Sequence, residues 1–461
     1  MLIKFRTQNF KSFKDLAELD LTKGKARKND DRIARIKNVD ILKFASIFGA
    51  NASGKSNLVR ALKVMQFIVC TGTLPVDALN EYYKLDDTYE KKPTYFETII
   101  SISNRVFTYG FEVSLSSGII ESEWLVELIK NNDGSVRENE LFSKNNNIVK
   151  PGKGMPSGSG MIATRLRVYI DDVENNPRLL LLNRICKNMM NLQFDNDYLH
   201  DIISVFNWFS KSLKVVYPIN ALINPEIIYS SIGKIESILK AFDTGVVGLK
   251  TVDVGDDDFN NENSKYGIST ISIIPLFNLQ ANGKNNAKIF VKLPSGLWII
   301  KYNQNKVSYS KITFLHDENE DHKFNSNNES DGTMRLFELT EPLATDEKDT
   351  TFVIDELDRC LHPSLTMQYV YTFLKKANKN GNNNQLIVTT HESRLLDLEK
   401  LRRDEIWFTE KTNNESKLYS LEEFNVRFDL VIDKAYMEGR YGGVPIFDKL
   451  YLSNIVEDEN K

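Results

Sequence analysis

The feature that most constrains this sequence is an eight-residue loop pattern near its N-terminus. Residues 49–56 read Gly-Ala-Asn-Ala-Ser-Gly-Lys-Ser, the spacing of a glycine-rich loop that wraps around phosphate groups. Residues 41–48 are mostly apolar and predict a buried strand, and apolar residues at helical spacing follow the loop. This order predicts an α/β fold with the loop at a helix N-terminus. The alternative is a chance glycine-rich turn, and the flanking strand and helix argue against it.

The residue types in this loop suit a nucleoside triphosphate. Glycines let backbone N–H groups approach phosphate oxygens, and the helix N-terminus adds partial positive charge. Lys55 supplies a point charge to the outer phosphates, and the Ser56 hydroxyl suits Mg²⁺. The sequence has no Asn-Lys-x-Asp motif for guanine, so ATP is the expected nucleotide. We expect ATP contacts from Gly49, Asn51, Ser53, Gly54, Lys55, Ser56 and Asn57.

Two later segments with strand character end in residues that could act on the phosphates. Residues 351–356 read Thr-Phe-Val-Ile-Asp-Glu, so that Asp355 could hold Mg²⁺ and Glu356 could polarise the attacking water. Residues 386–391 read Leu-Ile-Val-Thr-Thr-His and could bring His391 to the terminal phosphate. Each motif alone also fits an ordinary strand end, with an acidic turn in the first case and a packed or surface histidine in the second.

A fourth motif, Glu-Ser-Asp-Gly-Thr at 329–333, opens a helix predicted over about 333–343. Ser330 is a good N-cap, so one interpretation is simply a helix start. That interpretation does not account for Gly332. A Ser-x-Gly pattern at a helix N-terminus also presents a hydroxyl and N–H groups to an anion. We therefore expect Ser330 and Gly332 to contact the terminal phosphate held by a second copy of the chain.

In this order the motifs resemble those of the ABC ATPase family: phosphate loop, signature, Walker B, D-loop and switch histidine. The resemblance makes residues 330–333 the signature, although the family's usual sequence there is Ser-Gly-Gly-Gln, and makes residues 357–363 the D-loop region. The Q-loop residue stays unassigned. Gln66 lies too early in the chain, and Glu97 lies at a more suitable distance.

Further stretches narrow the resemblance to the SMC/RecF branch of that family. They are Asn57, the opening Phe-Lys-Ser-Phe at 10–13 and a long insertion before the signature. Within this branch the chain resembles bacterial anti-phage defence ATPases of the RloA, AbiL and AriA type. The stretches that carry this narrower resemblance are 329–333, 355–363, 403–411 and 439–447.

The resemblance implies an ATPase that uses ATP and Mg²⁺ as the sensor or regulatory subunit of an abortive-infection system. Two heads would sandwich ATP in a homodimer or higher homo-oligomer. A separate effector, a nuclease or another toxin, would halt the cell after a phage-derived trigger. About 105 residues follow Glu356, which leaves little room for an appended nuclease.

Two other functions compete with this one. An SMC/RecF-like repair or clamp ATPase would need a long coiled coil, which the heptad pattern does not support, or a basic face. The candidate basic run, 23–37, is interrupted by Asp30 and Asp31, and the net charge of −4 excludes a basic surface overall. A scaffold that uses ATP only to dimerise would not need Glu356.

The chain divides by pattern into three parts. We predict one half of an ABC ATPase head over 1–164, a mainly helical insertion over 165–260 and the other half over 261–461. A further strand is predicted at 271–277. The three cysteines match no metal or disulfide spacing, and no apolar run is long enough to span a membrane, so we expect a cytoplasmic protein.

Overall fold

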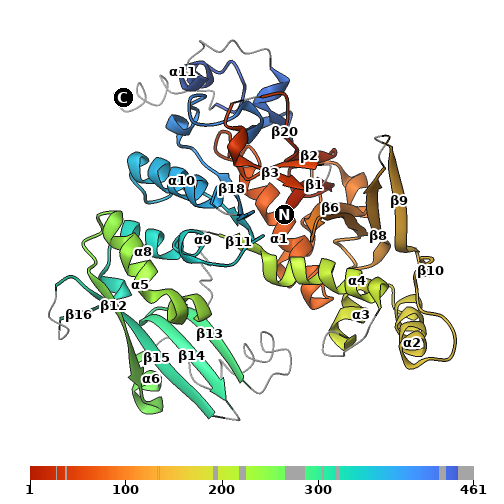
Figure 1. Cartoon of the computed structure of the whole chain (residues 1–461), viewed down its shortest axis with the longest axis horizontal. Coiled ribbons are helices and arrows are strands. Elements are labelled where there is room, and N and C mark those ends of the chain that lie inside the picture. The colour runs from red at the N-terminus through yellow and green to blue at the C-terminus, as the bar shows by residue number, and fades with distance from the viewer. Residues whose placement is uncertain are drawn as a thin grey trace, which may run out of the picture. The chain divides into compact units, whose positions relative to one another are not determined.

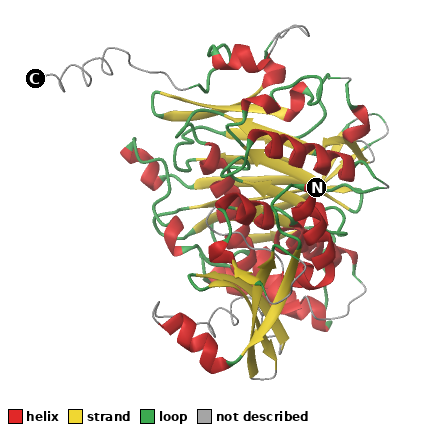
Figure 2. Cartoon of the chain, turned by 90° about the vertical axis from the view of Figure 1, so that its left-hand side faces the viewer, coloured by secondary structure: helices red, strands yellow, loops and turns green. Residues whose placement is uncertain are grey.

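The computed structural model contains two compact units, each built from separate stretches of the chain (Figure 1). Unit 1 comprises Met1–Val215, Lys348–Leu357 and Ala377–Lys461, and unit 2 comprises Val216–Glu347 and Asp358–Lys376. Helices and strands occur in both units, and Figure 2 colours the chain by these two kinds of element. The structure describes all residues except 27, 37–38, 132, 134, 190–195, 218–224, 265–285, 304–305, 318–321, 380, 425–431 and 445–461.

A mainly parallel sheet forms the centre of unit 1. Its strands follow the order β11-β17-β18-β5-β19-β20. The neighbouring strands β17, β18, β5 and β19 are parallel, and β20 runs antiparallel to β19. Strands β5, β17 and β18 are buried along their whole length, as expected for apolar strands inside a parallel sheet. The bounds are β5 Phe44–Phe48, β11 Leu213–Val216, β17 Thr351–Ile354, β18 Gln385–Thr389, β19 Ile406–Thr412 and β20 Glu415–Ser420.

An antiparallel sheet is the second layer of unit 1. Its order is β10-β9-β8-β7-β6-β1-β2, and a separate pair joins β3 to β4. Buried and partly exposed residues alternate along β1 and β2, which fits a sheet with one face against the core. The bounds are β1 Leu2–Gln8, β2 Ala17–Asp20, β3 Ile33–Ile36, β4 Val39–Leu42, β6 Thr94–Ile102, β7 Arg105–Val113, β8 Ile120–Lys130, β9 Val136–Asn145 and β10 Ile148–Pro151.

Five α-helices complete the described part of unit 1. The longest, α1 (Lys55–Thr71), presents apolar residues such as Leu58, Leu62 and Met65 to the core. It ends at Gly72, whose φ of 74° is in the left-handed region that glycine adopts readily. The others are α2 Met161–Asn175, α3 Leu181–Met189, α4 Asp197–Asn207 and α11 Ile432–Met437.

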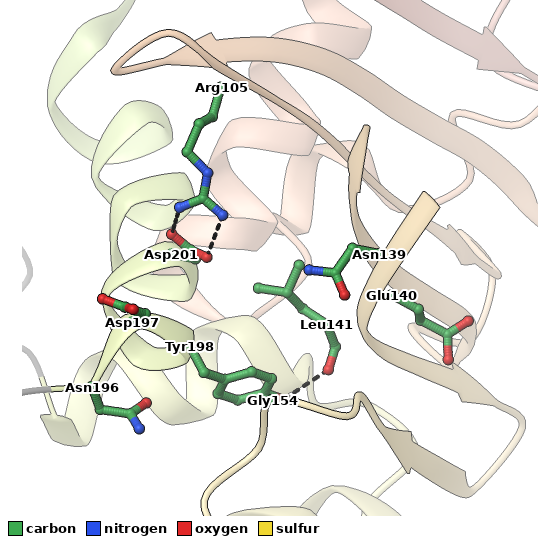
Figure 3. Close-up of a pocket in the computed structure, with 9 residues that line it drawn as sticks. All are labelled: Arg105, Asn139, Glu140, Leu141, Gly154, Asn196, Asp197, Tyr198 and Asp201. Atoms are coloured by element: carbon green, nitrogen blue, oxygen red, sulfur yellow. Dashed lines mark hydrogen bonds and ion pairs between the residues drawn. The ribbon is translucent and has the colours of Figure 1, made fainter. Parts of the chain in front are cut away.

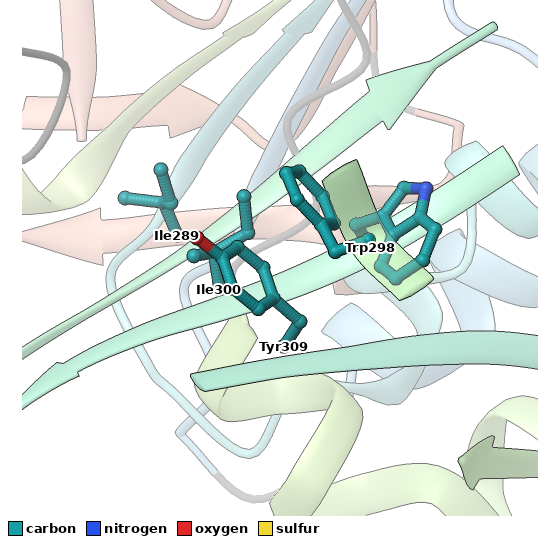
Figure 4. Close-up of a cluster of buried hydrophobic side chains, with 5 residues drawn as sticks. Ile289, Trp298, Ile300 and Tyr309 are labelled. Atoms are coloured by element: carbon teal, nitrogen blue, oxygen red, sulfur yellow. The ribbon is translucent and has the colours of Figure 1, made fainter. Parts of the chain in front are cut away.

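Unit 2 is built on an antiparallel sheet. Its strands follow the order β12-β15-β14-β13, with β16 also paired to β15. An aromatic cluster covers part of this sheet (Figure 4): the Phe259 and Tyr309 rings stack at 3.9 Å, and Trp298 meets Phe259 edge-on. The bounds are α5 Pro225–Ala241, β12 Gly248–Val254, α6 Asp256–Asn263, β13 Asn286–Leu293, β14 Gly296–Asn303, β15 Lys306–Leu315, β16 Lys323–Asn325, α8 Asp331–Glu338, α9 Glu341–Ala344 and α10 Pro363–Ala377.

The predicted insertion, 165–260, does not form a unit of its own. Its part up to Val215 belongs to unit 1, and the remainder joins the sheet of unit 2. The first part is tied to α1, because the Gln66 amide donates to the carbonyls of Phe209 and Leu213, both at 2.8 Å. The range contains helices, but it also contains β11 and β12.

Two further predictions from the sequence have different outcomes in the structure. The helix predicted over about 333–343 is divided into α8 and α9. The strand predicted at 271–277 lies outside the described residues, as do residues 445–447 of the tail motif and Arg27 and Lys37 of the basic run. In the described parts of the chain, no helix is both long and apolar enough to cross a membrane.

Candidate functional site

In unit 1, the residues predicted to act on ATP follow strands of the parallel sheet and lie where those strands end. In the strand register Ile47 of β5 lies opposite Thr389 of β18, and Ile354 of β17 lies opposite Val388. Since these strands are parallel, the turns that follow them emerge side by side. The glycine-rich loop, Asp355 and the residues after Thr389 therefore meet, although they come from three distant parts of the sequence.

The loop after β5 leads into α1 through a glycine in the left-handed region. Gly54 has φ 118° and stands at the N-cap of α1, with no side chain to cap the helix. The helix therefore begins without a side-chain cap, and its N-terminus suits a bound anion. Lys55 is buried, with 6% of its surface exposed, and its Nζ donates to the carbonyls of Gly49 at 2.7 Å and Ala50 at 3.0 Å. Asn51 is exposed at the outside of the loop.

A hydroxyl and a carboxylate suited to Mg²⁺ lie together at the start of α1. The Ser56 hydroxyl donates to Asp355 Oδ1 at 3.2 Å, across 299 positions of sequence. Asp355 is buried, and Thr389 Oγ1 donates to the same carboxylate oxygen at 2.6 Å. Hydroxyl and carboxylate oxygens are the ligands that Mg²⁺ takes in phosphate sites. The donor set therefore fits the metal that the sequence implies.

Thr389 has a second contact that the sequence did not reveal. Its Oγ1 accepts a hydrogen bond from the Glu356 backbone N–H at 2.8 Å. One threonine thus fixes both acidic residues of the Walker B motif. The signal available in the sequence was a hydroxyl residue as the last position of a buried strand, directly before Thr390 and His391.

Glu356 and His391 follow neighbouring strands at the same edge. Glu356 has φ 49°, a left-handed conformation that is uncommon for a residue other than glycine. Such strain is concentrated at functional sites, where the surrounding structure imposes it. His391 is exposed and follows Thr390, whose N–H donates to the Ile47 carbonyl at 3.1 Å. His391 therefore follows the strand next to β5, which carries the loop, and Glu356 follows the strand beyond it.

Serines from two other segments hold the outer side of the loop. The Asn57 amide donates to Ser12 Oγ at 2.7 Å. The Ser416 hydroxyl lies 2.7 Å from Ser12 Oγ and donates to the Ser53 carbonyl at 2.6 Å. A Cβ added at Gly54 would lie 2.5 Å from Ser416 Oγ, so this packing also requires glycine there. Ser12 belongs to the Phe-Lys-Ser-Phe motif, which thereby gains a structural role at the loop.

The predicted signature residues lie in unit 2, at the start of α8. Ser330 caps this helix, because its Oγ accepts from the Thr333 N–H at 3.1 Å. A Cβ added at Gly332 would lie 3.0 Å from the Cys360 carbonyl, so the predicted D-loop region passes close against this glycine. The structure thus gives Gly332 a packing reason within unit 2. The other predicted site residues all belong to unit 1.

The two Q-loop candidates are engaged elsewhere. Gln66 is buried in α1 with its amide on the Phe209 and Leu213 carbonyls. The Glu97 carboxylate lies in β6, where it accepts from Arg6 at 2.8 Å and Trp124 Nε1 at 3.0 Å. Both side chains therefore serve the packing of unit 1.

A separate polar pocket of about 480 Å³ opens in unit 1 (Figure 3). The Arg105 guanidinium at its wall donates to Asp201 Oδ2 at 2.8 Å and to Glu127 at 2.6 Å. The Tyr198 hydroxyl donates to the Leu141 carbonyl at 2.8 Å. These groups satisfy one another, and the pocket contains none of the loop, Walker B or switch residues.

The glycine-rich loop, the Ser56–Asp355 pair and the parallel sheet define an ATPase domain of the P-loop class with an α/β fold. The sequence matches the family described as "AAA domain, putative AbiEii toxin, Type IV TA system" over residues 44–148 and 230–397. This match spans more than half of the chain, so the chain belongs to that family.

Among solved structures, the SMC head domain from Thermotoga maritima is 14% identical to the chain, with a TM-score of 0.31. That alignment covers 91% of this chain and 98% of the SMC head chain. A comparison with curated proteins gives no match.

Proposed function

We propose that the chain binds and hydrolyses ATP at the edge of the unit 1 sheet. The observation that carries this proposal is the Ser56–Asp355–Thr389 group beside the glycine-rich loop. The loop and the N-terminus of α1 bind the phosphates through backbone N–H groups. Lys55 turns from the Gly49 and Ala50 carbonyls to the outer phosphate oxygens. Ser56 and Asp355 hold Mg²⁺, which neutralises charge on the phosphates.

In the chemical step, a water oxygen forms a bond to the terminal phosphorus while the bond from that phosphorus to the bridging oxygen breaks. Glu356 orients this water and accepts its proton, and ADP leaves with the bridging oxygen. His391 donates a hydrogen bond to the terminal phosphate. The Thr389 hydroxyl supports both acids, because it holds the Asp355 carboxylate and the Glu356 N–H.

The second part of the proposal concerns assembly. Ser330 and Gly332 of a second copy would cover the terminal phosphate, so that two heads enclose two ATP molecules. The N-terminus of α8 suits this role because it combines a hydroxyl with helix N–H groups. Closure on ATP and opening after hydrolysis would then shift the population between two assembly states.

The third part concerns the cellular role. We place the chain as the sensor and regulatory subunit of an anti-phage defence system that controls a separate effector, such as a nuclease, in response to a phage-derived trigger. Support comes from the four motif stretches in the sequence and from the family description, which names an AbiEii toxin and a type IV toxin–antitoxin system. A neighbouring reading frame that encodes a nuclease would favour this role.

The competing role is an SMC/RecF-like repair or clamp ATPase that acts on DNA. Its candidate basic run is partly used within the chain: Lys23 pairs with Asp30 at 2.8 Å, and buried Arg402 contacts the same carboxylate at 2.7 Å. These pairs favour a structural role for the run. DNA binding that falls steeply with salt concentration would favour the competing role.

The experiment that tests the proposed function is the solution mass of Glu356→Gln with and without ATP and Mg²⁺, together with its turnover. We expect ATP binding, a mass that doubles only with ATP, and turnover at least about a hundredfold below wild type, as for loss of a catalytic base. Exposed Glu399→Gln is the matched control and should turn over normally. Unchanged turnover in Glu356→Gln would contradict the assignment, and a high mass without ATP would contradict ATP-driven closure.

A further inference from the structure

A second segment of unit 1, residues 432–443, reaches the first residue of the phosphate-binding loop. It consists of α11 and the turn that contains Gly443. The buried Tyr436 connects the two: its hydroxyl donates to the Gly443 carbonyl at 3.1 Å, within the segment, and accepts a hydrogen bond from the Gly49 backbone, in the loop. Burial raises the pKa of Tyr436 to about 12, so the hydroxyl keeps the proton that it donates.

The approach of the segment to the loop is close enough to require glycine. Gly443 has φ 67°, and a Cβ added there would lie 3.3 Å from the Gly49 Cα and 3.1 Å from the Thr409 carbonyl. Both the conformation and the tight space therefore favour glycine at this position. The backbones of Gly49 and Gly443 pack directly against each other across almost the whole sequence.

Aromatic rings hold the segment in place independently of the Tyr436 hydroxyl. The Tyr436 ring stacks on Phe408 at 5.4 Å and meets Phe48 edge-on at 6.1 Å. Tyr441 stacks on the same Phe408 ring at 5.7 Å. The Tyr441 hydroxyl is buried and has no hydrogen-bond partner among the described residues. The two tyrosines thus share one ring cluster, and Tyr436 alone adds a bond to the loop.

The two polar groups of Gly49 are held by different partners. Lys55 Nζ donates to its carbonyl at 2.7 Å, whereas its N–H is bonded to Tyr436. If Lys55 turns to a bound phosphate, Gly49 keeps its contact with segment 432–443. The segment then still supports the first residue of the loop. The position of this segment therefore bears on the geometry that ATP meets.

We propose that segment 432–443 is a strut of the phosphate-binding loop whose docking is linked to nucleotide binding, so that a partner that displaces the segment lowers the affinity for ATP. This inference rests on the proposed ATPase function and adds a route of regulation to it. Linkage is reciprocal, so bound ATP must also stabilise the docked segment. Tyr436 acts as a positioning residue, since its hydroxyl reaches the loop and not the nucleotide.

The test compares two tyrosine substitutions in the full chain. Tyr436→Phe removes the hydroxyl that bonds to Gly49 and to the Gly443 carbonyl, and Tyr441→Phe removes a hydroxyl without a partner among the described residues from the same ring cluster. We expect Tyr436→Phe to weaken equilibrium binding of ATP with Mg²⁺ about fivefold, in line with the loss of one buried hydrogen bond. Tyr441→Phe should bind ATP as wild type does.

A second pair of variants distinguishes the contact of Gly443 with Gly49 from backbone strain at a glycine with positive φ. Gly443→Ala places a Cβ against Gly49, whereas Gly439→Ala has a similar φ of 79° but meets no atom within 4 Å. We expect ATP binding at least about tenfold weaker for Gly443→Ala, as two close contacts must yield, than for Gly439→Ala. Equal losses in the two variants would show strain alone and would overturn the proposed contact.

Amide hydrogen exchange distinguishes linkage to ATP binding from a purely structural role of Tyr436. In the wild type, ATP should slow amide exchange across 432–443, and Tyr436→Phe should reduce that protection. A lower unfolding temperature with unchanged ATP affinity in Tyr436→Phe would overturn the linkage and leave the ATPase function standing. If the wild-type chain does not bind ATP at all, both the proposed function and this inference fail.

Discussion

The N-termini of α1 and α8 make an instructive comparison, because both begin with the small residues that suit an anion. At α1 the N-cap is Gly54, which has no side chain to satisfy the helix. At α8 the N-cap is Ser330, whose hydroxyl accepts from the Thr333 N–H at 3.1 Å and lies 3.0 Å from the Thr333 hydroxyl. The first helix begins without a side-chain cap, whereas Ser330 caps the second.

Because of this difference, we expect the N-termini of α1 and α8 to contribute differently to phosphate binding. In the proposed site, a phosphate at the N-terminus of α1 displaces no side-chain cap, so its bonds to the helix add directly to affinity. Ser330 must exchange an existing bond for one to phosphate, so its net gain is smaller. Under the proposed function, we therefore expect α1 to contribute more to ATP affinity and α8 to respond to a phosphate that is already bound.

The largest effect is expected from a substitution at the N-terminus of α1. Lys55→Ala removes the cation whose Nζ lies over the loop, and we expect binding of ATP with Mg²⁺ to be lost. Equilibrium binding measured by calorimetry checks this. The control is Lys150→Ala, at a lysine whose side chain is 79% exposed, which should bind normally. A normal ATPase rate in Lys55→Ala would sink the assignment of the site.

The second prediction tests α8. Asp is as good an N-cap as Ser, so Ser330→Asp should keep the free energy of unfolding within about 0.5 kcal/mol of wild type. Its negative charge opposes a bound terminal phosphate, so we expect the ATP-dependent doubling of mass to be lost. Ser330→Asn caps the helix without charge and should still double. Doubling of the Asp variant would place α8 away from the phosphate.

The third prediction concerns Thr389, which supports the acids opposite α1. Thr389→Val removes the hydroxyl that bonds to Asp355 and Glu356, and we expect ATP turnover to fall about tenfold, because two buried polar groups lose a partner. Thr7→Val is the matched control, since its buried hydroxyl has no partner among the described residues. Steady-state hydrolysis distinguishes the two, and equal rates would show that the bridge is dispensable.

The smallest expected effect concerns the strand that leads to α1. The Glu405 carbonyl accepts from Ser46 Oγ of β5 at 3.2 Å, and burial raises the pKa of the Glu405 carboxyl from 4.5 to about 8. The folded protein therefore binds this proton more tightly than the unfolded chain. The free energy of unfolding should fall as pH rises from about 4.5 to about 8.

Glu405→Gln removes this titration. We expect the wild type to lose a few degrees more in unfolding temperature than Glu405→Gln between pH 6 and pH 8.5. Thermal unfolding at the two pH values measures the difference. Parallel shifts in the two proteins would show that the Glu405 carboxyl does not change its protonation on unfolding.

The sequence anticipated the elements of the candidate site better than their assembly. The loop at 49–56, the strand at 351–354 and the strand at 386–389 all form where their patterns predict them. The division into units was less accessible, because the part of 165–260 up to Val215 joins α1 through the buried Gln66 amide. Periodicity indicates a helix, but it does not indicate which core the helix will join.

The glycine-rich loop can be recognised in the sequence, since its eight contiguous residues carry the glycines, the lysine and the serine that a local backbone conformation requires. In contrast, the contact of Ser56 with Asp355, the bonds of Thr389 to both acids and the packing of Gly443 against Gly49 arise only when the chain folds. These contacts depend on the order of parallel strands and on close approach of distant backbones. No local propensity specifies either of them, because both follow from how the chain buries its apolar surface as a whole.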